Sequence, residues 1–141
     1  MNPLEHIQQP QQTSYYQKDI LLNLSFTFTT NNRIFFPKGK HKDLFNHNYK
    51  FDISIKSPVD TYGLAIDFYQ IERDYNEKIA PQLNAPILNE SLPVINTTVE
   101  NIAYFIWQQF ENILDQTSTV QTLTLYETAH HSVTLNKDIM Q

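Results

Sequence analysis

Residues 45–55 read Phe-Asn-His-Asn-Tyr-Lys-Phe-Asp-Ile-Ser-Ile, a run in which apolar side chains and one imidazole alternate with polar side chains. A period of two predicts a β-strand with one buried face. The buried face would carry His47 among large apolar side chains: Phe45, Tyr49, Phe51, Ile53 and Ile55. The sequence therefore predicts an ionisable ring that points toward the core.

The same alternation begins at Ile20 and predicts an earlier strand. Its buried face would carry Ile20, Leu22, Leu24, Phe26 and Phe28. Asn31-Asn32 and residues 37–40 are expected to form irregular chain between the two strands. The two strands would then make a hairpin-like pair with a long connection.

Two helices are expected in the middle of the chain. Asp67 is a candidate cap for a first helix that ends near Pro81, with apolar residues at helical spacing. Thr97 and Glu100 have the spacing of a capping box at the start of a second helix. Alternation returns at Leu123, Leu125 and Glu127 and again at Val133 and Leu135. This order of elements predicts an α+β domain with both helices on one face of a four-stranded antiparallel sheet.

Length and composition narrow the class of protein. The 141 residues suit one domain, taken as residues 18–141, after a Gln-rich arm (residues 1–17) that is mobile or ties the chain to another subunit. Fifteen acidic against ten basic side chains disfavour nucleic acid as a partner. The lack of cysteine excludes disulfides, thiolate metal ligands and a thiol nucleophile. No signal peptide or membrane-spanning stretch is recognised, so a cytoplasmic protein is expected.

Six blocks of sequence, in order and with fitting gaps, resemble the 6-pyruvoyl-tetrahydropterin synthase and 6-carboxy-tetrahydropterin synthase family. The resemblance spans about residues 20 to 135. The blocks are residues 26–34, 45–49, 63–68, 83–89, 98–101 and 126–128.

The resemblance implies a tunnelling fold (T-fold) whose subunits associate through their sheets into a ring, here a homo-oligomer of three or six copies. Family members bind zinc through three histidines and act on dihydroneopterin triphosphate. A cysteine serves as base with the help of an Asp-His pair. A buried glutamate holds the amino-pyrimidine edge of the pterin.

Most of the residues that this chemistry needs are replaced. The zinc positions fall at Asn32, Phe45 and His47, so one of three ligands remains and no zinc cofactor is expected. The cysteine position falls at His41, or at Asp43 if the gap shifts. The Asp-His pair falls at Asn84 and Ala85, which cannot move a proton at physiological pH. His41 is kept as a candidate acid-base residue.

The ligand-binding set implied by the resemblance is Glu127, Thr98 and His47. For Glu127 the alternative is a strand-end residue that reaches solvent or a neighbouring subunit. For Thr98 the alternative is a role in helix entry. For His47 a core position with one backbone hydrogen bond is favoured over metal ligation. A rebuilt metal site from His41, His47 and one of His130 or His131 has little support from spacing, because the latter pair is expected in a turn.

Two hypotheses of function follow. The favoured one is a non-catalytic binder of a pterin-like or purine-like heterocycle, without the zinc chemistry of the family. The alternative is an active lyase on dihydroneopterin triphosphate or a related pterin, with a site rebuilt around His41 and His47.

Overall fold

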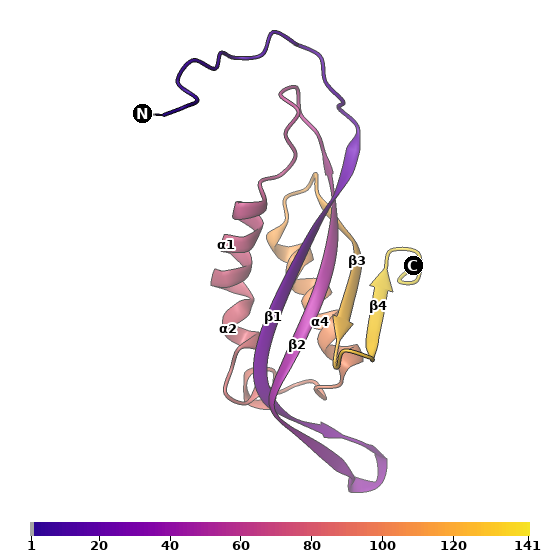
Figure 1. The fold of residues 1–141 in the computed structure, drawn as a ribbon. Helices are drawn as coiled ribbons and strands as arrows, with labels where there is room; N and C mark the ends of the chain where they lie inside the picture. Colours follow the sequence, from indigo (N-terminus) through magenta and orange to yellow (C-terminus); the bar gives the residue numbers. More distant parts are fainter. Residues whose placement is uncertain (1) are drawn as a thin grey trace.

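Four antiparallel strands form one sheet in the order β1-β2-β3-β4, with the helices on one of its faces (Figure 1). The computed structural model describes residues 2–141. The strands are β1 (Asp19–Phe35), β2 (His41–Pro58), β3 (Thr119–Tyr126) and β4 (Ser132–Asn136). The helices are η1 (Pro37–Gly39), α1 (Phe68–Lys78), α2 (Ala80–Leu83), α3 (Leu88–Ser91) and α4 (Val99–Ile113). The predicted α+β architecture is confirmed, and α2 and α3 are short additions to the two expected helices.

The core lies between the sheet and the longer helices. Phe26 of β1 and Phe51 of β2 meet Tyr75 of α1 and Phe110 of α4, with ring centroids 4.1 to 5.9 Å apart. Such contacts bury much apolar area and add specific edge and stacking geometry. The alternation therefore sets the buried face from Leu22 onward in β1 and from Tyr49 onward in β2, whereas Ile20, predicted on that face, is exposed at the start of β1.

The first strand is longer than the sequence predicts. Asn31 and Asn32 belong to β1, and pairing with β2 continues to the pair Phe35 and His41. Only the tip of the hairpin, around η1, is not paired as strand, and Lys38 and Gly39 there have φ of 66° and 74°. This two-stranded hairpin projects beyond the body of the protein (Figure 1). The prediction failed because side chains from the 84–97 segment hold the free edge of β1, which no local pattern reveals.

A bulge in β2 overturns the predicted position of Phe45. Thr30 pairs with His47 but Asn32 pairs with Leu44, so two residues of β2 stand opposite Asn31. Asn46 takes a positive φ of 46° and donates its backbone N–H to Asn31 Oδ1 at 2.8 Å. An extra residue shifts the alternation by one. Phe45 is consequently 75% exposed instead of buried.

Helix capping agrees with the sequence at one helix and differs at the other. Asp67 caps α1 by accepting the Tyr69 N–H at 3.0 Å, as predicted. The cap of α4 is Thr98, whose Oγ1 accepts the Asn101 N–H at 3.2 Å. The predicted capping box of Thr97 and Glu100 is wrong because Thr97 is drawn into a buried polar cluster.

The N-terminal segment before β1 forms no helix or strand over residues 2–18 and leads away from the sheet (Figure 1). Nearly all of its side chains are exposed. Across residues 2–141, none of the helices has the length and apolar character needed to span a bilayer.

Candidate functional site

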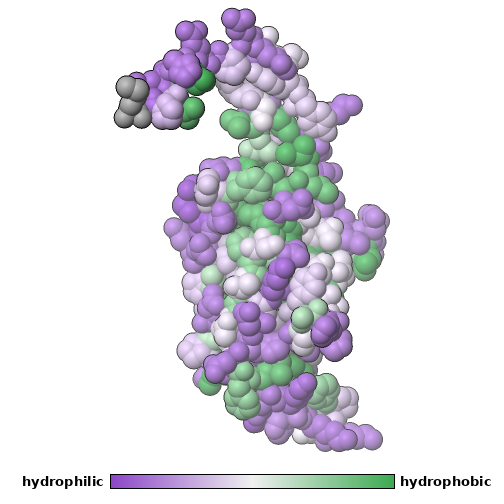
Figure 2. All heavy atoms as spheres, in the orientation of Figure 1, coloured by the Kyte–Doolittle hydropathy of each residue, from purple (hydrophilic) through white to green (hydrophobic). Residues whose placement is uncertain are grey.

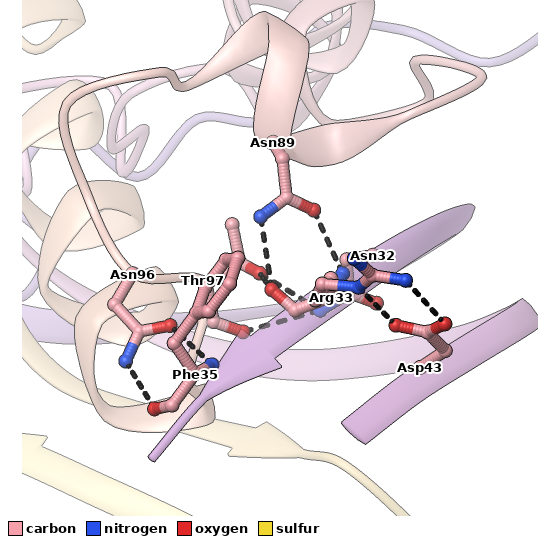
Figure 3. A network of polar contacts seen from close by, with 7 residues as sticks. All are labelled: Asn32, Arg33, Phe35, Asp43, Asn89, Asn96 and Thr97. Carbon is pink, nitrogen blue, oxygen red and sulfur yellow. Dashed lines mark hydrogen bonds and ion pairs between the residues drawn. The ribbon is translucent and has the colours of Figure 1, made fainter. Parts of the chain in front are cut away.

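Three polar side chains, from β1, β2 and the loop before α4, meet beneath the root of the hairpin. Asn32 of β1 is only 4% exposed, and its Nδ2 lies 3.1 Å from Tyr49 Oη, from Thr97 Oγ1 and from the Thr97 carbonyl. The Tyr49 hydroxyl in turn lies 3.3 Å from Asn32 Oδ1. Figure 3 shows Asn32 and Thr97 within this network. The amide of Asn32 is therefore hydrogen-bonded at both ends inside the protein.

The surroundings of Tyr49 disfavour its ionisation even further than in an exposed tyrosine. Burial raises the pKa of Tyr49 to about 12, the hydrogen bond with Asn32 lowers it in part, and the charge of Glu127 raises it again. A neutral phenol is both a donor and an acceptor. Tyr49 thus links Asn32 to the region around Glu127 without carrying charge at physiological pH.

His47 lies next in this chain of contacts. Its ring meets Tyr49 edge-on with centroids 4.5 Å apart, and its Nε2 lies 2.5 Å from the Glu127 carbonyl oxygen. Because a carbonyl only accepts, Nε2 carries a proton and donates it to Glu127. His47 thus makes a hydrogen bond to one backbone carbonyl, as predicted, but from a half-buried position and not from the core.

Glu127 occupies the first position after β3. It is half-buried, so its carboxylate is more open than the predicted place on a buried face. Its backbone N–H donates to the His131 carbonyl at 3.0 Å, which closes the turn between β3 and β4. His130 and His131 lie in this turn, as expected. The Glu127 backbone carbonyl contacts His47, and the Glu127 charge is near enough to raise the pKa of Tyr49.

The residues at the expected zinc positions do not fit a zinc ion. The Asn32 amide is engaged, Phe45 has no donor atom and is exposed, and His47 uses one nitrogen for a carbonyl. In the described part of the chain, no three His, Asp or Glu side chains gather as a metal site. His41, at the start of β2, stands six strand residues from His47, roughly 20 Å away. The rebuilt site with His41 and His130 or His131 is thus not assembled within one chain.

Asn84 and Ala85, at the expected Asp-His positions, hold a loop against β1. Asn84 Oδ1 accepts the Thr29 N–H at 3.2 Å, and the Ala85 carbonyl accepts from Thr30 Oγ1 at 2.6 Å. Their contacts stabilise the loop that leads to α3. The observed role of Asn84 and Ala85 is therefore structural.

Two further asparagines clamp the same edge of β1 (Figure 3). Asn89 accepts the Arg33 N–H at 2.8 Å and donates to the Arg33 carbonyl at 2.9 Å. Asn96 does the same for Phe35, at 2.9 and 2.8 Å. Each side-chain amide thereby replaces a neighbouring strand for one residue. The sequence carried no signal for these clamps, because they join residues more than fifty positions apart.

Comparisons with known proteins agree on the family. The family model described as 6-pyruvoyl tetrahydropterin synthase matches residues 21–138. A Dictyostelium discoideum 6-pyruvoyl tetrahydrobiopterin synthase is 26% identical over 106 residues, which cover 65% of this chain and 78% of the relative.

Solved structures agree on the fold. The Caenorhabditis elegans 6-pyruvoyl tetrahydropterin synthase superposes with a TM-score of 0.71 at 15% identity, covering 86% of this chain and 98% of the other. The Plasmodium falciparum 6-pyruvoyl tetrahydropterin synthase gives a TM-score of 0.65 at 13% identity, with coverage of 85% and 98%.

Proposed function

The chain belongs to the 6-pyruvoyl tetrahydropterin synthase family, and on that premise we propose that it binds a pterin-like or purine-like heterocycle without performing the zinc-dependent reaction. Its sheet and helices are those of the tunnelling fold. In this function the chain would use the scaffold of the family and a glutamate, Glu127, but no metal.

One observation carries the proposal. Asn32, where the resemblance places the first zinc ligand, is locked by Tyr49 and Thr97 in a buried cluster that is complete without a cation. Binding a metal would break the hydrogen bonds of a buried amide that has partners at both ends. An amide oxygen is also a poorer zinc ligand than an imidazole nitrogen. Losing the Lewis acid removes the main source of polarisation for the substrate.

In the proposed function, the Glu127 carboxylate binds the heterocycle. A half-exposed carboxylate can accept two parallel hydrogen bonds from a ring N–H and the neighbouring exocyclic amine. Pterins and guanine both present that pair of donors. Binding through Glu127 needs no metal and no proton transfer. His47 and Thr98 complete the proposed ligand-binding set, His47 by fixing the Glu127 backbone and Thr98 from the start of α4.

Thermal stabilisation by ligand tests the role of Glu127. Unsubstituted pterin and guanine are expected to raise the Tm of the wild type, and adenine, which lacks the same edge, is not. Glu127→Gln should abolish the shift, because the amide presents a donor to one of the two ligand donors. Glu111→Gln, on the exposed face of α4, is the matched control. An unchanged shift in Glu127→Gln would reject the carboxylate as the anchor.

The alternative lyase is disfavoured by the separation of His41 and His47, and it has its own test. Dihydroneopterin triphosphate is incubated with the protein and Zn²⁺, and products are separated by chromatography. We expect no new pterin. A product that disappears in His41→Ala would establish the lyase, whatever the result with Glu127→Gln.

Homo-oligomerisation is proposed on the strength of the family alone. Light scattering on the purified chain is expected to give three or six times the mass of 16.6 kDa. A monomeric mass would contradict a ring.

A further inference from the structure

A cavity of about 360 Å³ opens beside Asn32 at the root of the β1–β2 hairpin. Apolar atoms make up most of its wall, and four apolar side chains contribute to it: Phe35, Leu44, Phe45 and Ile87. Figure 2 shows apolar residues at the surface where the hairpin leaves the body. Phe45, turned outward by the bulge, contributes the most exposed ring, at 75%.

The asparagine side chains in the wall already make hydrogen bonds within the protein. Asn31 donates to the Pro86 carbonyl at 2.8 Å and accepts the Asn46 N–H at 2.8 Å. Asn32 and Asn89, also in the wall, have partners at both ends of their amides. A polar ligand group would gain little here, because it would have to displace hydrogen bonds that hold β1.

The single cation in the wall is neutralised. Arg33 Nε and Nη2 donate to the two carboxylate oxygens of Asp43 at 2.6 and 2.9 Å, a bidentate pair. The hydrogen bond from Arg33 lowers the pKa of Asp43, so the carboxylate stays ionised at neutral pH. Asp43 thus leaves no uncompensated positive charge in the wall for an anionic group.

We propose that this cavity binds an uncharged, largely apolar group of the ligand, an aryl or alkyl substituent, and rejects phosphate and carboxylate. For the heterocycle that carries the substituent, this rests on the proposed function. The volume is in the range of small-molecule pockets. The ligand of this chain would then differ from dihydroneopterin triphosphate, the substrate that the resemblance implies, in carrying no phosphate at this point.

A neutral and an anionic probe of equal size test the cavity without any heterocycle. Titrations of 4-fluorobenzyl alcohol and 4-fluorobenzoate are followed by fluorine NMR line broadening. The alcohol is expected to bind and the benzoate is not. Phe45→Ser should weaken the alcohol about tenfold, since most of one aromatic contact is lost. Phe36→Ser removes a ring that is 48% exposed but lies outside the cavity wall, and it should leave the titration unchanged.

Two substitutions in the ion pair test the charge argument. Asp43→Asn leaves Arg33 unpaired and should allow benzoate to bind, whereas Arg33→Gln should not. The proposal fails if wild-type protein binds benzoate as well as the alcohol, or if neither probe binds. If no probe binds and Phe45→Ser lowers the mass of the assembly, the wall is an interface between copies, and the proposal is likewise overturned.

Two pterins that differ in their 6-substituent show whether the cavity proposal or the proposed function fails. The cavity adjoins Asn32, which contacts Glu127 through Tyr49 and His47. If one ligand spans this distance from Glu127, 6-phenylpterin should stabilise the protein more than 6-carboxypterin does, and Phe45→Ser should remove the difference. If no pterin binds but 4-fluorobenzyl alcohol does, the proposed function fails and the apolar cavity stands. If both pterins bind equally well, the cavity proposal fails and heterocycle binding stands.

Discussion

The side chains of Asn32 and Tyr49 hydrogen-bond to each other across the first two strands, with Nδ2 to Oη at 3.1 Å and Oη to Oδ1 at 3.3 Å. Both residues are buried on the helix-covered face of the sheet. Their contact fills the position where the family resemblance places a zinc ligand. It also ties β1 and β2 to the start of α4 through Thr97.

Asn32→Ala is expected to lower the free energy of unfolding by about 2 to 3 kcal/mol, because it leaves Tyr49 Oη and the Thr97 carbonyl without their partner. Urea denaturation measures the loss. Asn23→Ala, an exposed β1 position bonded only to Ser54, should change stability by about 0.5 kcal/mol or less. Combined with Tyr49→Phe, the Asn32→Ala loss should be less than additive, and strict additivity would show that the pair is not coupled.

Stability should fall above pH 10. Burial raises the pKa of both Tyr49 and Tyr75 to about 12, above the unfolded value of 10.0. A raised pKa in the folded state means full stabilisation below pH 10, lost as the pH rises through about 12. Each tyrosine would remove about 1.4 kcal/mol per pH unit in that window. Absorbance titration at alkaline pH should show these two of the eight tyrosines ionising last, and a single transition near pH 10 for all eight would contradict this.

Tyr75→Phe is expected to leave stability unchanged or to raise it slightly. The Tyr75 hydroxyl is buried and finds no hydrogen-bond partner within residues 2–141, whereas its ring packs on Phe26 and Phe110. Removing the hydroxyl keeps the ring contacts and ends an unpaired polar burial. Tyr49→Phe, which loses a hydrogen bond, is the comparison and should cost about 1 kcal/mol. A clear loss in Tyr75→Phe would mean that a bound water satisfies its hydroxyl.

The two asparagine clamps should act independently. Asn89→Ala should speed hydrogen exchange of the Arg33 amide, and Asn96→Ala that of the Phe35 amide, because each clamp accepts one of these N–H groups. Each variant serves as the other's control, with about 1 kcal/mol lost in stability. If hydrogen exchange became equally faster at the Arg33 and Phe35 amides in either variant, the whole hairpin would be fraying and the clamps would not act independently.

Thr97 and Thr98, the two residues before α4, should stabilise different parts of the protein. Thr98→Ala should cost about 1 kcal/mol through loss of the helix cap. Thr97→Val should weaken the Asn32 cluster and leave the cap intact. Glu100→Ala should have little effect, since no capping box forms. A loss in Glu100→Ala as large as that in Thr98→Ala would restore the capping box that the sequence predicted.

Side-chain alternation alone does not place every residue of β2 on the correct face of the sheet. Alternation correctly placed Tyr49 and Phe51 in the core, yet it put Phe45 there too. The bulge that turns Phe45 outward depends on Asn46 adopting a positive φ and bonding Asn31, a choice made by the pairing of two strands. In the same way, Thr97 has the spacing of a helix cap but is recruited by Asn32, which lies sixty-five positions away.

By itself the sequence determined the order of elements, the buried face of the sheet and the resemblance to one family, because side-chain periodicity and block order are properties of the chain. It also shows that cysteine is lacking, and the resemblance places Asn32 and Phe45 at two of the three expected zinc positions. Only the tertiary structure decided what these residues contact. The closed cluster around Asn32, the backbone bond of His47, the neutralised Arg33 and the cavity beside Phe45 all join segments distant in sequence. Distances between such segments arise only when the strands pair and the helices pack.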